Sequence, residues 1–212
     1  MVQVKICGLK NKEAIEAAAN NGADFIGFVF AKSKRRVTKD EATKLAQYVP
    51  DHVKKVGVFV NETSENIQAI AREVGLDYIQ LHGDETPEFC KELGLPVIKA
   101  FEVKEASDLD KISAYDCAYY LLDSPAGKYR GGSGETFDWS IVKEYDFLSK
   151  KILLAGGLRA DNIQKAIAEV APAGVDVSSG VETDGEKDLE KIQAFLYAAK
   201  KGDSNGKIST TR

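Results

Sequence analysis

Histidine and cysteine are scarce in this sequence, which limits the chemistry that it can support. Its 212 residues include two histidines and three cysteines. A catalytic metal held by paired histidines is therefore not expected. The cysteines, at positions 7, 90 and 117, are odd in number and lack the spacing of a metal knuckle. We expect free thiols in a reducing compartment, the cytoplasm, rather than a disulfide framework.

Long apolar runs and an excess of basic charge are also absent. No segment approaches the roughly 18 consecutive apolar residues of a membrane-spanning helix, and no charged leader with an apolar core follows Met1. The formal net charge of −4 provides no basic field for nucleic acid or for an anionic membrane. Neither a G-x-G-x-x-G motif nor a Walker lysine occurs, which disfavours dinucleotides and nucleoside triphosphates as ligands.

The sequence does contain an unbroken alternation of short β-branched or apolar runs with longer segments of helical period. Such alternation implies a parallel sheet, and eight units in a chain of this length favour a single-domain α/β fold, the (β/α)8 TIM barrel with a closed sheet, over an open doubly wound sheet. The predicted strands are Val2–Cys7, Asp24–Phe30, Lys54–Val60, Tyr78–Leu81, Val97–Phe101, Cys117–Asp123, Ile152–Ala155 and Gly174–Ser178. The predicted helix N-caps are Asn11, Thr38, Thr63, Thr86, Ser107, Asp138, Asp161 and Thr183 or a nearby residue.

One domain accounts for the chain. No stretch rich in proline, glycine and serine divides it, and we assign residues 1–200 to the catalytic barrel. The segment Lys201–Arg212 has no apolar period and is expected to be a frayed polar tail.

Polar side chains at the carboxyl ends of two predicted strands are the first candidates for chemistry, because TIM-barrel sites are built from the loops that follow those ends. The period of two puts Lys5 and Cys7 on the inner face of the first strand, where Lys5 could favour the Cys7 thiolate. Asp123 ends the sixth strand, three steps away around the ring, so it would face Cys7 across the mouth as an acid faces a base. Plain structural interpretations stay open, with Cys7 as a small buried hydrophobe and Asp123 as a strand-end cap or ion pair. Cys90 and Cys117 are expected in the core.

Two glycine-containing loops follow the last two strands. One holds Gly156 and Gly157, and the other holds Ser178, Ser179 and Gly180. Glycines let backbone N–H groups approach an anion closely, and the loops after strands seven and eight of TIM barrels form a recurring phosphate site. The pair of loops predicts a ligand that carries phosphate.

Further polar residues belong to the predicted mouth. Gln80 and His82 share the inward face of the fourth strand and would line the wall of the site, and Asp176 could orient a ligand in a similar way. Four cations within Lys32–Arg36 follow the second strand and could hold a carboxylate, although such runs are usually only solvated. The loop Gly127–Gly134 could be a lid or a mobile crossover.

Seven motifs occur in a fixed order along the chain: Lys5–Gly8, Gly27–Phe30 followed by Ser33–Arg35, Val56–Asn61, Gln80–Gly83, Gly131–Gly134 with Thr136–Trp139, Ala155–Leu158, and Asp176–Glu182. Together they resemble the phosphoribosylanthranilate isomerase family of tryptophan biosynthesis, from the first strand to the last helix. The resemblance implies an isomerase that needs neither cofactor nor metal. Its reaction would be the Amadori rearrangement of N-(5-phosphoribosyl)anthranilate to 1-(o-carboxyphenylamino)-1-deoxyribulose 5-phosphate.

By the same resemblance, Asp123 is the general acid that opens the ribose ring and Cys7 is the general base that removes the C2 proton. The acid must hold a proton near neutral pH, which partial desolvation would allow, whereas the base needs an accessible thiolate. The resemblance also implies that Arg35 binds the anthranilate carboxylate, with the adjacent Arg36 as its rival. The phosphate would bind to the two glycine-containing loops.

Two other functions stay open. The related sugar isomerase of histidine biosynthesis performs the same chemistry on a substrate with two phosphates, but its pattern has an aspartate where this sequence has Cys7. A non-catalytic phosphate-binding barrel would keep the glycine loops and would have no use for both Cys7 and Asp123. We expect a small phosphorylated substrate, no nucleic acid or membrane partner, and a monomer or a homodimer.

Overall fold

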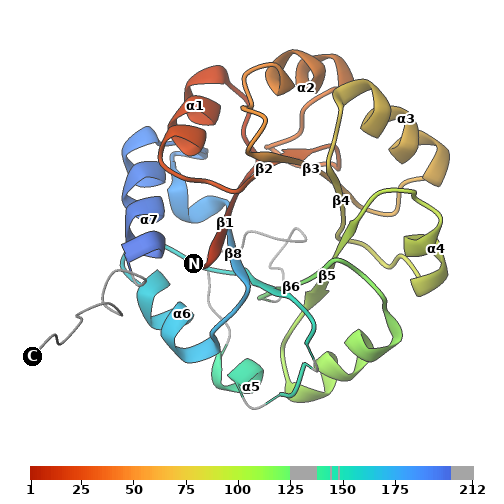
Figure 1. Cartoon of the computed structure of the whole chain (residues 1–212), viewed down its shortest axis with the longest axis vertical. Coiled ribbons are helices and arrows are strands. Elements are labelled where there is room, and N and C mark those ends of the chain that lie inside the picture. The colour runs from red at the N-terminus through yellow and green to blue at the C-terminus, as the bar shows by residue number, and fades with distance from the viewer. Residues whose placement is uncertain (125–137, 144, 148, 202–212) are drawn as a thin grey trace, which may run out of the picture.

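The computed structural model describes residues 1–124, 138–143, 145–147 and 149–201. Eight parallel strands follow one another in chain order around a barrel that closes because β1 pairs with both β2 and β8. Figure 1 shows the strands as a ring with the helices outside it. The predicted closed barrel is confirmed, and the open doubly wound sheet is excluded. The strands are β1 (Gln3–Cys7), β2 (Phe25–Val29), β3 (Lys54–Phe59), β4 (Tyr78–Leu81), β5 (Val97–Glu102), β6 (Tyr119–Asp123), β7 (Ile152–Leu154) and β8 (Gly174–Val177).

Four of the predicted N-caps begin helices as expected. The side chains of Asn11, Thr38, Thr63 and Thr86 each accept a hydrogen bond from the backbone N–H three residues further on. Thr38 also forms a reciprocal capping box with Glu41. The helices are α1 (Lys12–Asn20), α2 (Lys39–Ala46), α3 (Ser64–Val74), α4 (Pro87–Lys91), α5 (Ser140–Lys143), α6 (Ile163–Val170) and α7 (Leu189–Lys201).

Two other cap predictions were wrong by one or two residues. The connection after β5 is a 3-10 helix, η1 (Ala106–Ala114), whose N-cap is Glu105 rather than Ser107. The N-cap of α6 is Asn162 rather than Asp161. Asp138 does precede α5, and its Oδ1 accepts a hydrogen bond from the Ser140 N–H at 3.0 Å.

The last connection differs most from the prediction. After β8 the chain forms a short 3-10 turn, η2 (Ser179–Val181), and a hairpin of β9 (Glu182–Thr183) with β10 (Glu186–Lys187). Thr183 therefore caps no helix. Instead, Asp188 accepts hydrogen bonds from the N–H groups of the first turn of α7, while the Thr183 hydroxyl donates to Asp188 at 2.6 Å.

Aromatic side chains fill the barrel below its mouth. The rings of Phe25, Tyr78 and Tyr119 meet edge to face, with centroids 5.6 to 6.0 Å apart. The Tyr119 hydroxyl donates to Gln3 Oε1 at 2.7 Å. Leu121, two residues after Tyr119 and nearer the carboxyl end of β6, is fully buried in the same cluster. Because this interior is packed, a ligand site belongs at the carboxyl ends of the strands.

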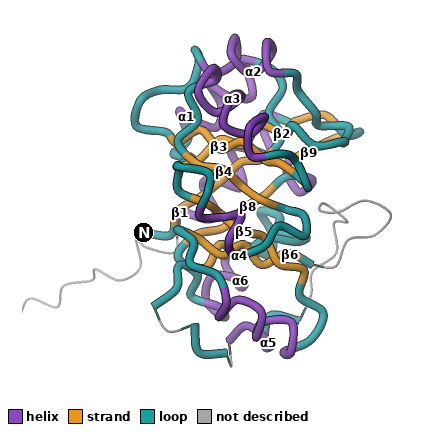
Figure 2. The backbone as a smooth tube through the Cα atoms, turned by 90° about the vertical axis from the view of Figure 1, so that its right-hand side faces the viewer, coloured by secondary structure: helices purple, strands orange, loops and turns teal. Residues whose placement is uncertain are grey.

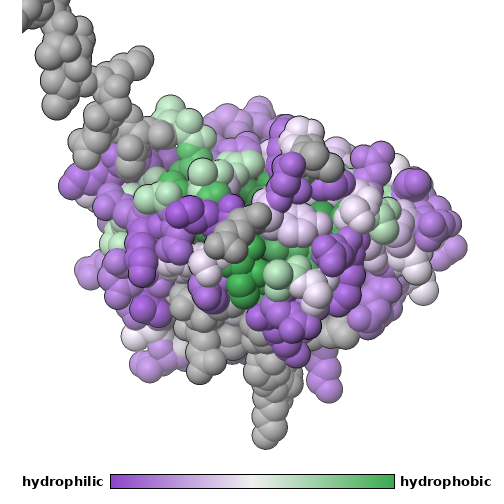
Figure 3. Space-filling view, turned by 90° about the horizontal axis from the view of Figure 1, so that it is seen from below, coloured by the Kyte–Doolittle hydropathy of each residue, from purple (hydrophilic) through white to green (hydrophobic). Residues whose placement is uncertain are grey.

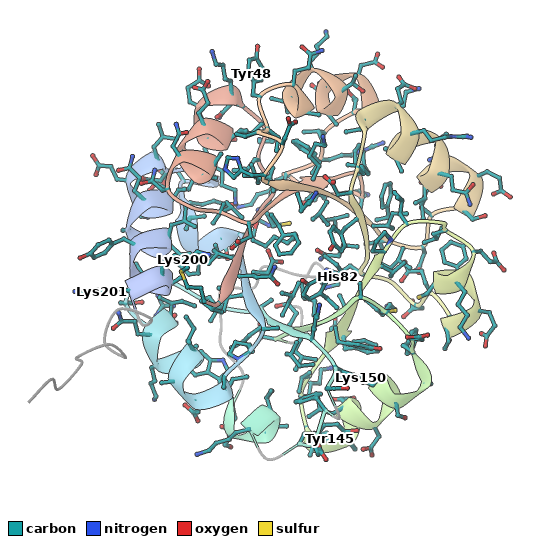
Figure 4. The ribbon with its side chains drawn as sticks, viewed as in Figure 1. Tyr48, His82, Tyr145, Lys150, Lys200 and Lys201 are labelled. Atoms are coloured by element: carbon teal, nitrogen blue, oxygen red, sulfur yellow. The ribbon has the colours of Figure 1, made fainter. Side chains whose placement is uncertain are left out.

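Most exposed side chains among the described residues are polar, and α7 reaches back to the beginning of the chain. Figure 2, turned by 90°, shows the strands in the middle of the molecule with helices around them, and Figure 3 shows a mainly hydrophilic face with smaller apolar patches. Lys200 of α7 reaches the start of the barrel, where its Nζ donates to the Val2 carbonyl at 3.0 Å and to Asp24 Oδ2 at 2.7 Å (Figure 4). None of the described helices has the length and apolar character needed to span a bilayer.

Candidate active site

A cavity opens at the carboxyl ends of β6, β7 and β8. It joins Asp123, at the end of β6, to Asp176 in β8 and to both glycine loops. The lining residues are Asp123, Ala155, Gly156, Gly157, Leu158, Asp176, Val177, Ser178, Ser179 and Gly180. The predicted acid and the predicted phosphate loops thus share one cavity.

Glycine is required in both loops of the cavity. Gly156 and Gly157 have φ angles of +83° and +62°, in the left-handed region that side chains rarely adopt. A Cβ atom on Gly156 would lie 2.6 Å from the backbone nitrogen of Ser124, and one on Gly180 would overlap the Leu158 carbonyl oxygen. The loops therefore present backbone to the cavity, an arrangement that can hold an anion.

Asp123 is a buried carboxyl with a strongly shifted pKa. The residue is 6% exposed, and burial, followed by the negative charge of Asp176, raises its pKa to about 7. A backbone hydrogen bond from Ser124 acts in the opposite direction. His82 Nε2 lies 3.6 Å from Asp123 Oδ2. Near neutral pH a large fraction of Asp123 therefore holds a proton, as a general acid must.

The fully buried Lys5 forms an ion pair with Asp176 of the cavity lining, with 2.9 Å between Lys5 Nζ and Asp176 Oδ1. Burial lowers the pKa of Lys5, but Asp176 and Cys7 together raise it above its ordinary value. Burial likewise raises the pKa of Cys7, and the charge of Lys5 offsets only part of that rise. Lys5 therefore favours the Cys7 thiolate, but desolvation of the thiolate outweighs this effect and leaves the pKa of Cys7 above its ordinary value.

Cys7 lies at the end of β1, 7% exposed, and packs beside Val29 and Val58. Gly27 of the neighbouring strand leaves room for the thiol, because a Cβ atom there would lie 2.9 Å from Cys7 Sγ. The Ser178 hydroxyl donates to the Cys7 carbonyl at 3.1 Å. The predicted base is thus joined directly to the second glycine loop.

Gln80 and His82, which were predicted to line the wall of the site, lie close to each other, but neither is among the described residues that line the cavity. Gln80 Nε2 lies 3.5 Å from His82 Nδ1, and Figure 4 places His82 inside the ring of strands. Gln80 is 1% exposed, and its Oε1 has no hydrogen-bond partner among the described residues. A buried acceptor of this kind suits a ligand hydroxyl.

The two neighbouring arginines occupy different environments. Arg35 packs on Gly8, directly after Cys7, with 11% of its side chain exposed. Arg36 is exposed. Arg35 donates from Nε and Nη2 to the two carboxylate oxygens of Glu182, at 2.6 and 3.0 Å. Arg35 is therefore the arginine that lies at the mouth, and it already binds a carboxylate side-on.

Glu182 and Lys187, for which the sequence predicted no role, lie beside Arg35 at the same rim. Glu182 lies 2.8 Å from Lys187 and 3.2 Å from Lys34, in addition to its contact with Arg35. Although burial raises the pKa of Glu182, Arg35 and Lys187 hold it at about 2. In the sequence, Glu182 ends the motif Asp176–Glu182, whereas Lys187 lies beyond all seven motifs.

Residues 4–198 match the family model described as N-(5'phosphoribosyl)anthranilate (PRA) isomerase. The chain belongs to the phosphoribosylanthranilate isomerase family. The isomerase of Listeria welshimeri is 54% identical over 197 residues, which cover 93% of this chain and 98% of that protein. Monomers generated from the dimeric phosphoribosylanthranilate isomerase of Thermotoga maritima match with a TM-score of 0.86 and 40% identity, covering 95% of this chain and 100% of that one. A phosphoribosylanthranilate isomerase in complex with reduced 1-(o-carboxyphenylamino)-1-deoxyribulose 5-phosphate matches with a TM-score of 0.84 and 38% identity, with the same coverage.

Some of the features predicted from the sequence lie away from the cavity or outside the described residues. The loop Gly127–Gly134, predicted as a lid or a crossover, lies outside the described residues, as do the motif residues 131–137. Cys90 lies in the main hydrophobic core, and Cys117 packs against that core. Both therefore have the structural role expected of them.

Proposed function

We propose that the chain catalyses the Amadori rearrangement of N-(5-phosphoribosyl)anthranilate to 1-(o-carboxyphenylamino)-1-deoxyribulose 5-phosphate in tryptophan biosynthesis. One observation carries the proposal: a carboxyl whose pKa lies near 7 shares a cavity with two loops suited to phosphate. Membership of the isomerase family supports it, as does the relative bound to a reduced form of this ketose.

In the proposed reaction Asp123 and Cys7 move the protons. Asp123 gives its proton to the ring oxygen as the C1–O bond breaks and the nitrogen lone pair forms a C=N bond. The Cys7 thiolate then takes the C2 proton, and the resulting enolamine tautomerises to the ketose. The raised pKa of Asp123 supports its role as the acid, while the raised pKa of Cys7 makes its thiolate scarce but strongly basic. Substrate and product are isomers, so no cofactor is proposed.

The remaining site residues bind and orient the substrate in this scheme. The phosphate occupies the loops Gly156–Gly157 and Ser178–Gly180, and the anthranilate carboxylate binds Arg35. Because Glu182 uses Nε and Nη2 of Arg35, the Nη1 group is the donor proposed for the substrate. The ribose hydroxyls contact Gln80, His82 and Asp176.

The reaction is tested by adding the purified protein to freshly prepared phosphoribosylanthranilate and following the loss of fluorescence beyond spontaneous decay. Cys7→Ala and Asp123→Asn should each lower kcat by at least about 100-fold while the protein stays folded. Cys117→Ala, outside the cavity, is the control and should keep its activity. Normal turnover in a folded site variant would remove the role of that residue. No turnover by the unaltered protein would favour the histidine-pathway isomerase or a binding-only barrel.

The carboxylate contact has its own test because two arginines compete for it. Arg35→Ala should raise KM by at least about tenfold, as loss of a charge-assisted hydrogen bond does. Arg36→Ala should change KM by less than about twofold, since an exposed charge contributes little. The reverse order would move the contact to Arg36.

The same proposal includes the domain organisation, the location and the oligomeric state of the enzyme. Residues 1–200 form a single catalytic domain, and residues 201–212 are a polar tail. The enzyme works in the cytoplasm, which its three free cysteines support. It acts as a monomer or a homodimer, and the dimeric relative favours the second.

A further inference from the structure

The hairpin β9–β10 carries a buried lysine whose contacts end at the second glycine loop. Lys187 has 3% of its side chain exposed. Its Nζ donates to the Ser178 carbonyl oxygen at 2.8 Å, and it lies 3.3 Å from Ser178 Oγ and 2.8 Å from Glu182 Oε1. Lys187 takes no part in the proton transfers or substrate contacts proposed for the reaction.

The Ser178 carbonyl oxygen accepts two hydrogen bonds, from Lys187 Nζ at 2.8 Å and from the Val181 N–H at 3.4 Å. The direction of this carbonyl sets the direction of the next backbone N–H. None of the peptide bonds among the described residues is cis. In a trans peptide the carbonyl and the following N–H point in opposite directions. Because the Ser178 carbonyl points to the hairpin, the Ser179 N–H points away from it. Ser179 also lines the cavity, which makes this N–H a candidate donor to an anion there.

Glu182 connects Lys187 to the opposite end of the site. Its Oε1 accepts hydrogen bonds from Lys187 Nζ and from Arg35 Nε, and its Oε2 accepts one from Arg35 Nη2. Glu182 begins β9, and Arg35 lies in the connection that follows β2. One carboxylate is thus shared between the lysine that orients the phosphate loop and the arginine proposed for the substrate carboxylate.

Packing alone gives no reason for these charges. Lys187 and Glu182 have 3% and 5% of their side chains exposed, so both charges are desolvated. Replacing a buried ion pair by apolar side chains of similar volume is often neutral or stabilising. Lys187 does, however, supply the shorter and charge-assisted of the two hydrogen bonds to the Ser178 carbonyl, and Glu182 holds the Arg35 guanidinium in a set direction.

We infer that Lys187 is a positioning residue that presents the Ser179 N–H to the substrate phosphate, and that Glu182 couples this arrangement to Arg35. The inference rests on the proposed function for the identity of the ligand, because it takes the anion in the cavity to be the substrate phosphate. One connected set of side chains then aligns the sites for both anionic ends of the substrate.

Inorganic phosphate is the probe that tests this inference, because calorimetric titration of the intact protein needs no turnover. Lys187→Met keeps the length of the side chain and removes its charge, and we expect phosphate to bind at least about tenfold more weakly. Lys10→Met is the matched control. Lys10 bonds Glu186 of the same hairpin at 3.1 Å, and its loss should change phosphate affinity by less than about twofold.

Two further variants separate positioning from stability. Lys187→Arg keeps the charge and should recover part of the lost affinity. Glu182→Gln keeps its size and lies outside the lining of the phosphate cavity, yet it should weaken phosphate binding by about threefold. A purely structural role would instead lower the melting temperature and leave the phosphate affinity of the folded protein unchanged.

The outcomes distinguish this inference from the proposed reaction. It is overturned if folded Lys187→Met binds phosphate as well as the unaltered protein, if Lys10→Met loses as much affinity, or if the unaltered protein binds no phosphate. If Lys187→Met does not fold, unchanged phosphate affinity in Glu182→Gln overturns it. If the phosphate affinities of the parent and its variants fall in the expected order but the parent does not isomerise phosphoribosylanthranilate, only the proposed reaction is refuted.

Discussion

The position of Asp123 in the barrel disfavours the ionised form of its carboxyl group. Burial, and then Asp176, raise its pKa from the ordinary 3.8 to about 7. Between about pH 4 and pH 7 the folded protein keeps a proton that the unfolded chain has released, so the folded state loses stability as the pH rises through this window. The full shift corresponds to at most about 4 kcal/mol. Catalytic acidity and stability therefore conflict at this residue.

Asp123→Asn should remove that conflict. We expect the variant to be more stable than the parent at pH 8 and to lose this advantage toward pH 4, while its kcat falls as described above. Chemical unfolding of both proteins at pH 4.5, 6 and 8 measures the difference. The control is Asp138→Asn, an exposed aspartate whose pKa is lowered by hydrogen bonds from Ser140, which should give no gain at pH 8. Parallel pH profiles for parent and Asp123→Asn would contradict the effect of burial.

Lys5 is the residue that limits the rise in the pKa of Cys7. Lys5→Met should raise that pKa further and slow the alkylation of Cys7 by iodoacetamide at pH 8, because the thiolate is the reactive form. Mass spectrometry of the peptide that contains Cys7 gives the rate. The variant should also be destabilised by about 3 kcal/mol, since Asp176 is left as an unpaired buried charge.

The double variant Lys5→Met with Asp176→Asn separates these two effects. Removing both charges should recover much of the stability. Cys7 should still react more slowly than in the parent, because Lys5 affects the Cys7 pKa more than Asp176 does. An alkylation rate equal to that of the parent in both variants would show that Lys5 does not act on the thiol.

Among the elements, the second glycine loop has the least tolerance for change. Gly180→Ala would place a Cβ atom on the Leu158 carbonyl oxygen, so one of the two loops must move. We expect KM for phosphoribosylanthranilate to rise by at least about tenfold, because misplaced N–H donors lose charge-assisted hydrogen bonds to phosphate. Gly94→Ala is the control. Gly94 has a φ of +70° with open space around it, so its substitution should cost about 1 kcal/mol of stability and leave KM unchanged. An unchanged KM in Gly180→Ala would argue against this loop as the phosphate site.

The elements that the sequence predicts correctly are those specified by local chemistry. Each strand follows from an apolar run, and Thr38 and Thr63 cap their helices because the hydroxyl needs only an N–H three residues away. The hairpin β9–β10 has strands of two residues each, too short for a period to be visible. Its stability depends on partners far away in the chain, such as Lys10 for Glu186, and local patterns do not contain such contacts.

The same limit applies to the candidate site. Cys7 and Asp123 could be found because they end strands at the mouth of the barrel, and the glycines because their backbone role is local. Lys187 could not be found in this way, since its function depends on the fold of the hairpin that carries it. The net pKa of Cys7 was also beyond the sequence, because a neighbouring cation is visible there and the extent of burial is not.

At the scale of the whole molecule, α7 covers the outside of the barrel where its first and last strands meet. It packs against α1 and α6, on either side of the junction between β8 and β1. Ile192, Phe195 and Leu196 are fully buried, and their burial contributes about 6 kcal/mol in total. This is comparable to the whole stability of a typical domain, about 5–15 kcal/mol. The barrel should therefore not fold without α7.

Two truncations test where the folded domain ends. A chain that stops after Lys201 keeps all of α7, together with the contacts of Lys200 to Val2 and Asp24. We expect it to match the full chain in melting temperature and in kcat/KM, because the sequence beyond Lys201 has no apolar period with which to pack. A chain that stops after Asp188 should show no cooperative melting by circular dichroism. If the chain that stops after Lys201 lost stability or activity, the polar tail would contribute to the folded enzyme. The assignment of residues 1–200 as the whole domain would then be wrong.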